Sequence, residues 1–378
     1  MSLYSRRGVS AQKEEVHAAV SNLDQGLFPR AFCKVYPDFL NGDKDFINVM
    51  HADGAGTKGI LAYLYWKETG DATVWRGIAQ DAIVMNLDDL LCVGIYDQLL
   101  FNSTIDRNKN LIPAEVLKNI VDGSQEFFDQ MSSYGVHIHY LGGETADVGD
   151  VVRTIAVNGT LTARWPKSRI ITNEKIKAGN VIVGLASYGQ ASYESTYNSG
   201  IGSNGLTSAR HDILEHYYAD QFRESYDPAL SQEVVYLGKH RIKDIPEILS
   251  PTRTYAPLMK KLLEDHFEHL NGLIHCSGGG QTKCLKYVPY GVNLIKDHLF
   301  EPPTIFKKIQ EASHADDREM YQVFNMGCRM EIYCDPDFAP VIVREAHQFN
   351  IEAQVIGRVE ESEKRGLVIK TPNGSLTF

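Results

Sequence analysis

An acid, two glycines and a lysine lie within one short segment, residues 51–58, directly after an apolar run. Gly54 and Gly56 let backbone amides approach an anion closely, and Lys58 supplies a point charge. The carboxylate of Asp53 is suited to a divalent cation that bridges phosphate oxygens. The segment therefore predicts a phosphate and metal site. A tight strand-to-helix turn, in which the glycines serve only backbone geometry, explains this segment equally well when it is taken alone.

The same glycines match the pattern Gly-x-Gly-x-x-Gly over residues 54–59, but they do not predict a dinucleotide site. A Rossmann unit needs a second strand that ends in an acid about twenty residues further on. Residues 67–72 instead read Lys-Glu-Thr-Gly-Asp-Ala and lead into a predicted helix. A Walker A pattern is also absent from the sequence.

Two further acids, Asp81 and Asp88, are seven residues apart in a segment predicted to be helical, residues 81–93. Seven residues are nearly two helical turns, so both side chains project from one side of the helix. Acids on a helix more often form a solvated face. In this segment most of their neighbours are apolar, and buried carboxylates need cations or hydrogen-bond donors. Facing Asp53, these acids would form a magnesium site.

A third acidic cluster, residues 142–147, reads Gly-Gly-Glu-Thr-Ala-Asp and follows a predicted strand at residues 136–141. Glycines at the end of a strand, followed by the carboxylate of Glu144, again suit a metal-bound phosphate. His137 and His139 lie on one face of that strand. Strand histidines that lack a third nearby ligand are more often satisfied polar residues than metal ligands.

The second half of the chain offers groups of a different kind, namely backbone amides, hydroxyls, a carboxamide and a guanidinium. These groups suit a ribose phosphate and a carboxamide better than a protein partner. Each motif is weak alone, because Ser-Asn-Gly is a common turn and a glycine triplet is a common hinge. The residues are Ser203, Asn204, Gly205, Arg253, Gly278, Gly279, Gly280 and Asn325.

The elements that must position these groups fall into two halves. The first half alternates strand-like and helix-like segments, which predicts an α/β domain. The second half mixes the order of its strands and helices, which predicts an α+β domain. Its long Ser/Tyr/Gly-rich loop, residues 187–203, is of a kind that is usually functional or disordered. A chain of 378 residues also favours two cores over one, so we place the domains at residues 1–170 and 171–378.

The individual elements follow from the apolar periodicity, which is close to two residues in strands and 3.6 in helices. The predicted strands are residues 46–52, 136–141, 151–163, 181–186, 273–276, 329–333 and 353–359, and the predicted helices are residues 59–67, 81–93, 113–134, 206–218 and 254–267.

The composition argues against several classes of function. A net charge of −10 speaks against a nucleic-acid partner, because affinity for polyanions comes from lysine and arginine. The sequence has no run of about eighteen apolar residues, so we expect no membrane span. The first twelve residues hold two arginines but no apolar core, and we expect no signal peptide. The six cysteines form no Cys-x-x-Cys pair, which predicts reduced thiols in a cytoplasmic protein.

With these motifs in view, the whole chain resembles the aminoimidazole ribonucleotide synthetase family, also called phosphoribosylformylglycinamidine cyclo-ligase. The matches occur in the family's order from end to end, and order together with number makes the resemblance specific. The acid and glycine motifs of the first half are shared with a wider superfamily that includes selenophosphate synthetase and thiamine monophosphate kinase. The motifs at residues 251–255 and 319–327 resemble the cyclase branch in particular. The full set is Tyr4-x-x-x-Gly8-Val9, Asp53-Gly-x-Gly-Thr-Lys58, Asp81 and Asp89, Gly142-Gly-Glu-Thr-Ala146, Ser203-Asn-Gly205, Pro251-Thr-Arg-x-Tyr255, Gly278-Gly-Gly280 and Glu319-Met-Tyr-x-x-Phe-Asn-x-Gly327.

The resemblance implies an α/β N-terminal domain whose sheet joins that of a second subunit into a barrel, and an α+β C-terminal domain. The protein would be a homodimer that binds ATP in a cleft formed with the dimer mate. Its substrate would be the phosphoribosyl compound formylglycinamidine ribonucleotide. ATP would phosphorylate the formyl amide oxygen, the substrate's own amidine nitrogen would close the imidazole ring, and phosphate would leave.

The resemblance also assigns roles to residues, position by position. It makes Asp53, Lys58 and Asp81 the catalytic residues, with Lys58 in contact with phosphate. The carboxylates that would hold Mg²⁺ are Asp53, Asp81, Asp89 and Glu144. The ATP site would include Gly54, Gly56, Thr57, Asp89, Gly143, Glu144 and Thr145. The ribonucleotide would be held by Ser203, Asn204, Gly205, Arg253, Gly278, Gly279, Gly280 and Asn325.

Several features depart from the family's pattern. Gly202 stands where the family usually has a histidine, directly before the Ser-Asn-Gly motif and after the inserted loop at residues 187–203. A glycine-rich segment expected between residues 22 and 45 is missing, a Met-Pro-Gly after the third acidic cluster is absent, and Asn102 replaces an expected aspartate. We hypothesise that the inserted loop is a mobile lid that replaces the contacts of the missing histidine.

Two alternatives remain open from the sequence. The chain would be a non-catalytic, dimeric, nucleotide-binding paralogue if turnover had been lost with the histidine. It would be a related kinase or synthetase of the superfamily if it acted on another small substrate.

Overall fold

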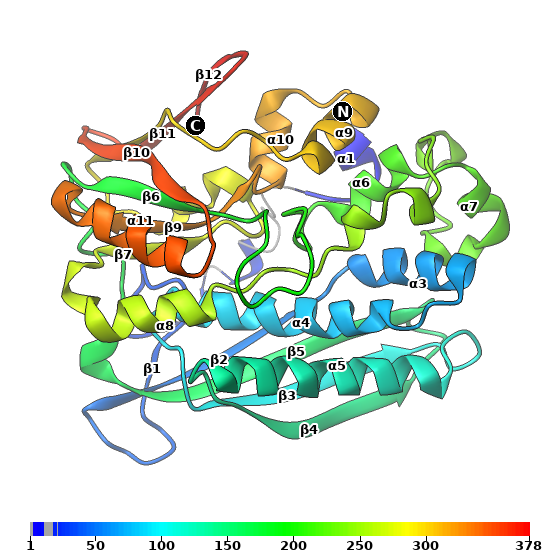
Figure 1. The fold of residues 1–378 in the computed structure, drawn as a ribbon, viewed down its shortest axis with the longest axis horizontal. Coiled ribbons are helices and arrows are strands. Elements are labelled where there is room, and N and C mark those ends of the chain that lie inside the picture. Colours follow the sequence, from blue (N-terminus) through cyan, green and yellow to red (C-terminus); the bar gives the residue numbers. More distant parts are fainter. Residues whose placement is uncertain (1–2, 11–17, 21) are drawn as a thin grey trace.

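The computed structural model describes residues 3–10, 18–20 and 22–378, so part of the leading segment considered for a signal peptide, residues 1, 2, 11 and 12, lies outside the described residues. Two mixed sheets form two domains, and helix α4 (Val74–Leu91) runs between the first sheet and the second domain (Figure 1). The expected two-domain organisation is therefore confirmed. In the described part of the chain, no helix combines the length and the apolar composition needed to cross a membrane.

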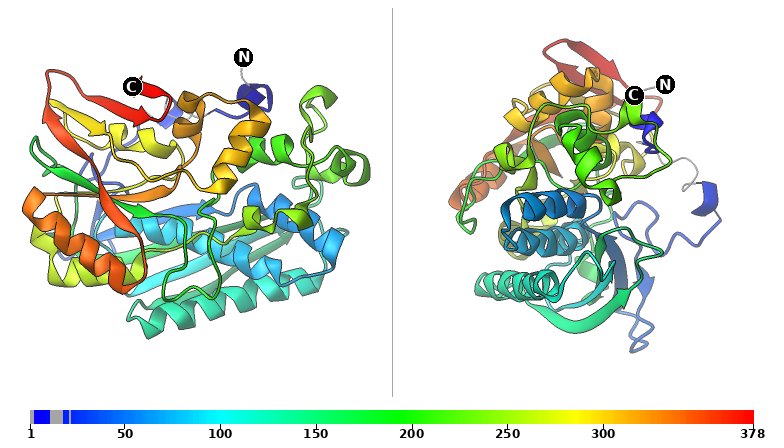
Figure 2. Two further views of the ribbon diagram at one scale, coloured as in Figure 1. Left: turned by 45° about the horizontal axis from the view of Figure 1, so that its top comes forward. Right: turned by 90° about the vertical axis from the view of Figure 1, so that its right-hand side faces the viewer.

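The first sheet has five strands in the order β1-β2-β5-β3-β4, and it is open rather than closed into a barrel within this chain. Helices α4 and α5 pack against one face, and α3 packs on α4 (Figure 2). The other face of the sheet carries no helix in these views. The elements are β1 (Tyr36–Pro37), β2 (Phe46–Gly54), β3 (Leu99–Arg107), β4 (Ile138–Asp147), β5 (Ile155–Pro166), α3 (Lys58–Thr69) and α5 (Ala114–Ser133), with a short α1 (Leu3–Arg6) before them.

Helix α4 begins at Val74, seven residues before its predicted start. It is apolar on all sides because it is covered by the first sheet, by α3 and α5, and by the second domain. Three acids, Asp81, Asp88 and Asp89, are nevertheless buried in it. The apolar context that predicted burial of these acids is thus confirmed.

The third acidic cluster is where the predicted elements are wrong. We expected the strand to end at residue 141, but β4 continues to Asp147 in parallel pairing with β3. Gly142 and Gly143 lie at an irregularity in that ladder, where a Cβ on Gly143 would stand 2.0 Å from the Ser103 carbonyl oxygen. Gly143 is therefore needed for close strand packing, whereas Gly142 has a φ of +85°, a backbone conformation that favours glycine.

The second sheet has seven strands in the order β12-β11-β8-β10-β6-β9-β7. Strand β6 has the predicted bounds, whereas the predicted helix at residues 206–218 is split because residues 214 and 215 form bridges to residues 240 and 238. The strands are β6 (Val181–Ala186), β7 (Gly272–His275), β8 (Val292–Lys296), β9 (Cys328–Cys334), β10 (Ala353–Glu361), β11 (Gly366–Thr371) and β12 (Gly374–Thr377), and the helices are α6 (Leu206–Ile213), α7 (Tyr217–Gln221), α8 (Ala256–Asp265), α9 (Thr304–Ser313), α10 (Asp317–Val323) and α11 (Ala339–Gln348).

The first sheet ends at Pro166 and the second begins at Val181, so the proposed division at residue 170 falls in the segment between them. The N-terminal residues do not follow that division. Arg7 is buried against the second domain, where its guanidinium contacts Asp212 at 2.6 Å and donates to the Ser208 hydroxyl at 2.7 Å. All six cysteines are buried and unpaired, as the prediction of reduced thiols requires.

Hydrogen bonds and an ion pair hold the inserted loop, residues 187–203, at several points along its length. Arg253 donates both arms of its guanidinium to Glu194, at 3.0 and 2.5 Å, and also donates to the carbonyl oxygens of Ala186 and Tyr188. Near the ends of the loop, Asn325 accepts a hydrogen bond from Ser187 and donates one to Gly200. These contacts do not support the hypothesis of a mobile lid, because opening the loop would leave the buried Arg253 without its carboxylate.

The ion pair between Glu194 and Arg253 yields the first prediction. Replacing Glu194 with alanine leaves a buried guanidinium unpaired, so we expect the free energy of unfolding to fall by about 3–5 kcal/mol. Urea denaturation with the wild-type chain alongside measures this directly. The control is Glu264→Ala, which removes an exposed i,i+4 partner of Lys260 and should cost less than about 1 kcal/mol. Equal stability of the two variants would contradict the proposed anchor.

Candidate active site at the domain interface

The carboxyl end of β2 brings Asp53 to the surface beside α4. Strand β2 pairs with β5 up to Gly54, where a Cβ would stand 2.1 Å from the Asn158 amide oxygen, and Gly56 adopts a φ of +57°. Both glycines are therefore required by the strand-to-helix turn, as the geometric interpretation of this segment proposed. That turn leaves the side chain of Asp53 exposed, with one oxygen accepting from the Gly54 amide at 2.7 Å.

Two of the predicted site carboxylates, Asp53 and Glu144, remain exposed to a ligand, and Asp53 is the one beside α4. Loss of hydration near α4 raises its pKa, and the neighbouring Asp89 carboxylate raises it further, against the Gly54 hydrogen bond. A carboxylate whose charge is disfavoured in this way gains most from a nearby cation. Asp53 is thus suited to hold the magnesium ion that accompanies a nucleotide.

Asp89 is held by two histidines that the sequence analysis did not include in the site. The Nδ1 atom of His275 lies 2.6 Å from one oxygen, and the Nε2 atom of His51 lies 3.2 Å from the other. Burial opposes ionisation of Asp89, but the hydrogen bonds from His275 and His51 hold its pKa well below the usual range. Both oxygens of Asp89 thus contact histidines, and its role as a magnesium ligand stays a prediction.

The protonation of His51 follows from its neighbours. The amide nitrogen of Asn86 donates to the carbonyl oxygens of Asp53, Ala82 and Gly159, so its oxygen faces His51 Nδ1 at 3.1 Å and accepts. A second N–H is then needed on Nε2 to reach Asp89, which favours the imidazolium form. Although burial lowers its pKa, contact with Asp89 raises the pKa of His51 above the usual value. Period-two alternation, which puts residues 51 and 53 on one face, is the sequence signal that would have found this histidine.

Lys58 and Asp81 form a buried pair and do not face a phosphate. The ammonium group donates to Asp81 at 2.9 Å and to the Ser250 carbonyl oxygen, and neither side chain is exposed. The same oxygen of Asp81 accepts from the amide and hydroxyl of Thr252, at 2.7 and 2.5 Å. Desolvation lowers the pKa of Lys58. Asp81 therefore projects towards the second domain rather than towards Asp53, and the phosphate contact of Lys58 stays a prediction.

Glu144, Gly143 and Thr145 lie across the sheet from Asp53. The pairing places Asp53 opposite Gly159, Gly159 opposite Ser103, and Ser103 opposite Gly143. Three steps of about 4.8 Å between strands separate the two ends by about 14 Å, too far to share one ion. Throughout residues 3–10, 18–20 and 22–378, no three His, Cys, Asp or Glu side chains are grouped as a metal ion would require. The four predicted carboxylates thus do not form one magnesium site within a single chain.

Two motifs predicted in the second half of the chain, residues 203–205 and 278–280, lie close together in the structure. The Ser203 hydroxyl lies 3.2 Å from that of Thr252, and a Cβ on Gly278 would stand 3.6 Å from the Asn204 amide nitrogen. Gly205 and Gly280 both pack so closely on residues 321–324 that a Cβ on either would approach within 2.5 Å of Phe324. The turns at residues 203–205 and 278–280 therefore form one surface beside the domain interface, with Gly279 between its neighbours at a φ of +99°.

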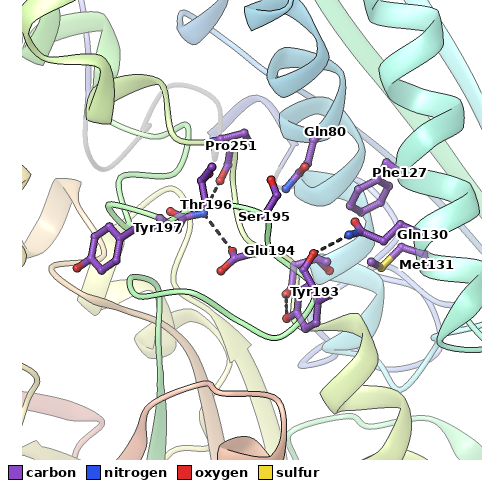
Figure 3. A pocket seen from close by; sticks show the side chains of 12 residues that line it. Gln80, Phe127, Gln130, Met131, Tyr193, Glu194, Ser195, Thr196, Tyr197 and Pro251 are labelled. Atoms are coloured by element: carbon purple, nitrogen blue, oxygen red, sulfur yellow. Dashed lines mark hydrogen bonds between the residues drawn. The ribbon is translucent and has the colours of Figure 1, made fainter.

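Two residues that were predicted to contact the substrate bond to other protein groups in this structure. Arg253 is buried in its pairing with Glu194, and the carboxamide of Asn325 bonds to Ser187, Gly327 and Gly200. These side chains anchor the inserted loop rather than face a ligand. A pocket does lie beneath the loop, where Tyr193 accepts a hydrogen bond from Gln130 of α5 (Figure 3). None of the predicted site residues lines that pocket.

Comparison with protein-family models gives two matches that together span most of the chain. Residues 38–165 match the AIR synthase related protein N-terminal domain, and residues 177–370 match the AIR synthase related protein C-terminal domain. Curated relatives cover both regions. The phosphoribosylformylglycinamidine cyclo-ligase of Methanocaldococcus jannaschii is 32% identical over 84% of this chain and 79% of its own length, and that of Pyrococcus horikoshii is 30% identical over 87% and 81%.

Solved structures share the fold at low sequence identity. A HypE–HypF complex aligns with 98% of this chain and 99% of the matched chain, at a TM-score of 0.58 and 16% identity. Thiamine monophosphate kinase from Aquifex aeolicus aligns with 94% of each chain, at a TM-score of 0.52 and 11% identity. The family models and curated relatives confirm the resemblance read from the motifs, and the chain belongs to the AIR synthase related protein family.

Proposed function

We propose that this chain catalyses the ATP-dependent cyclisation of formylglycinamidine ribonucleotide to aminoimidazole ribonucleotide, with release of ADP and phosphate, in the cytoplasm. The observation that carries the proposal is the 32% identity to a phosphoribosylformylglycinamidine cyclo-ligase that extends over 84% of the chain. The proximity of residues 203–205 and 278–280 beside the domain interface supports it, because the resemblance assigns both turns to the same ribonucleotide.

In the proposed reaction the formyl amide oxygen attacks the γ-phosphorus of ATP, and ADP leaves. The amidine nitrogen of the substrate then attacks the activated carbon, loses a proton and closes the ring as phosphate departs. Amides of the Ser-Asn-Gly and glycine turns would bind and orient the ribonucleotide. Magnesium, when bound with ATP, neutralises phosphate charge, and Asp53 is the ligand this chain offers it. The contact of partly exposed His51 with buried Asp89 would fix the β2 end that carries Asp53.

Substrate-dependent turnover is the first prediction of this proposal. Purified protein with ATP and magnesium should form ADP only when formylglycinamidine ribonucleotide is present, with one aminoimidazole ribonucleotide per ADP. Coupled ADP release and chromatographic detection of the imidazole product measure both. ATP binding without turnover would favour the non-catalytic paralogue, and ADP formation with a different amide or acid would favour a related kinase or synthetase.

Replacement of Asp53 by asparagine should lower kcat about 10²- to 10³-fold, because the proposed role of this carboxylate is to hold the magnesium ion that neutralises phosphoryl charge in the transition state. The melting temperature should change little, since Asp53 is exposed. Steady-state kinetics and thermal unfolding of Asp53→Asn and of the control Asp337→Asn, another exposed acid, test this. Near-wild-type kcat in Asp53→Asn would show that the site is misplaced.

We also propose that the open face of the first sheet packs against a second copy to form a homodimer. Met50 and Leu100 lie in one row, both paired to Thr162 of β5, and are 72% and 39% exposed. Leu141 adds a 60% exposed side chain on β4. Contiguous exposed apolar side chains of this kind mark interaction surfaces. Glu144 and Thr145, which lie far from Asp53 in one chain, would then serve the nucleotide site of the second copy.

Negative charge on the open face of the first sheet should prevent formation of the proposed dimer. The double variant Met50→Glu/Leu100→Glu should sediment as a monomer, because two desolvated carboxylates would have to be buried at the interface. Analytical ultracentrifugation of this variant and of Val121→Glu, which adds a charge at an exposed apolar position on α5, makes the comparison. Dimers of unchanged stability in the double variant would place the interface elsewhere.

A further inference from the structure

Arg329 is directed towards the domain interface by an irregularity in β9. Leu185 of β6 pairs with Met330, whereas the next residue, Ala186, pairs with Cys328, so Arg329 is the extra residue of a bulge. Bulges re-aim side chains and are frequent beside functional sites. The Arg329 carbonyl oxygen accepts from the Cys276 amide at 2.7 Å, which links the bulge to the strand that leads into the glycine turn. Sequence reasoning gave this arginine no role.

The guanidinium of Arg329 is buried but poorly neutralised. The residue is 2% exposed, and its Nε has no hydrogen-bond partner among the described residues. Its ion pair is with Asp88, at 3.4 Å, a long contact beside the bidentate pairing of Arg253 with Glu194. Asp88 is also shared, because it accepts from the Thr254 hydroxyl at 2.6 Å. A planar cation with five N–H donors is costly to bury with so few acceptors.

The Nη1 atom of this guanidinium faces Gly202. A Cβ built on Gly202 would stand 3.9 Å from the Arg329 Nη1 and 3.8 Å from the Asn325 amide nitrogen. Gly202 has a φ of +69° and precedes Ser203, so the backbone turns away and leaves this place without a side chain. The Asn325 amide nitrogen donates one N–H to the Gly200 carbonyl oxygen and keeps a second, so two nitrogen donors flank this position, as an oxyanion site requires.

We propose that Arg329 binds a phosphate oxyanion of the substrate in the space between Gly202 and Asn325. The inference rests on the proposed function only in identifying the ligand as that function's substrate. A guanidinium is suited to bidentate contact with two phosphate oxygens, and burial strengthens such a contact. The oxyanion has two sources, the phosphate that the ribonucleotide already carries and the phosphoryl group that is transferred to the amide oxygen.

Inorganic phosphate tests the site without any assumption about turnover. At constant ionic strength, set with chloride, phosphate should raise the melting temperature of the wild-type chain by about 2 °C or more, because it binds only the folded state. Arg329→Met should lose this shift, Arg329→Lys should retain part of it, and the surface control Arg344→Met should keep it. An adequate fold in Arg329→Met is checked by circular dichroism. A full shift in Arg329→Met overturns the proposal.

A second variant serves if Arg329→Met fails to fold. Asparagine tolerates left-handed φ values, so Gly202→Asn should fold and place its carboxamide against the guanidinium. It should lose the phosphate-dependent shift although Arg329 is intact. An undiminished shift in Gly202→Asn would show that phosphate binds elsewhere and would overturn the proposal.

Kinetics with formylglycinamidine ribonucleotide then identify the source of the oxyanion. Loss of kcat/KM in Arg329→Lys should be about 10- to 100-fold. A raised KM with unchanged kcat assigns Arg329 to the ribonucleotide's own phosphate, and a lowered kcat assigns it to the transferred phosphoryl group. Partial rescue of Arg329→Ala by added methylguanidine supports either assignment, because a merely structural role would not be restored by a free guanidinium. Unchanged kcat and KM in Arg329→Lys and Arg329→Ala would overturn the proposal.

These results separate the two proposals. A wild-type chain that shows an Arg329-dependent phosphate shift but makes no aminoimidazole ribonucleotide would refute the proposed function and leave the phosphate site. A wild-type chain that makes the product and whose Arg329 variants keep both the shift and the rate would refute the phosphate site and leave the proposed function.

Discussion

The burial of three carboxylates in α4 is the constraint on which the rest of the structure depends. A buried carboxylate is tolerated only when cations or hydrogen-bond donors surround it. Asp81 obtains Lys58 and Thr252, Asp88 obtains Thr254 and Arg329, and Asp89 obtains His51 and His275. Every one of these acids therefore ties the first domain to the second. The two domains cannot separate without breaking these pairs and leaving charged groups without partners, so we infer that they move as one body.

The same requirement determines which groups remain for a ligand. Lys58 pairs with one oxygen of Asp81, and both oxygens of Asp89 contact histidines. Asp53 stays exposed at the rim, and the turns at residues 203–205 and 278–280 keep their amides near the interface. The proposed binding surface therefore consists of the polar groups that are not paired within the domain interface. This explains how a chain rich in acids can nevertheless offer a place for phosphate.

The sequence predicted the two-domain organisation and most elements because their apolar periodicity is strong. Strand β6 had the predicted bounds, and α3 and α8 differed by one or two residues at each end. The end of β4 was predicted wrongly because glycines usually signal a loop. The pairing of β4 with β3 shows that the strand continues through them. Burial of Asp81 and Asp88 was predictable from apolar neighbours. Their partners were not, because Thr252 and Thr254 lie more than 160 residues away in sequence.

Two arginines of the second domain show how the departures from the family's pattern fit together. Arg253, which the family motif assigns to substrate, is neutralised by Glu194 from the inserted loop. Arg329 has a long contact with Asp88, lies over the Tyr255 ring, and faces the backbone at Gly202, where the family usually has histidine. In this chain Glu194 neutralises Arg253, whereas the Nη1 atom of Arg329 lies beside Gly202. The proposed contact with a phosphate oxyanion therefore falls to Arg329 rather than to Arg253.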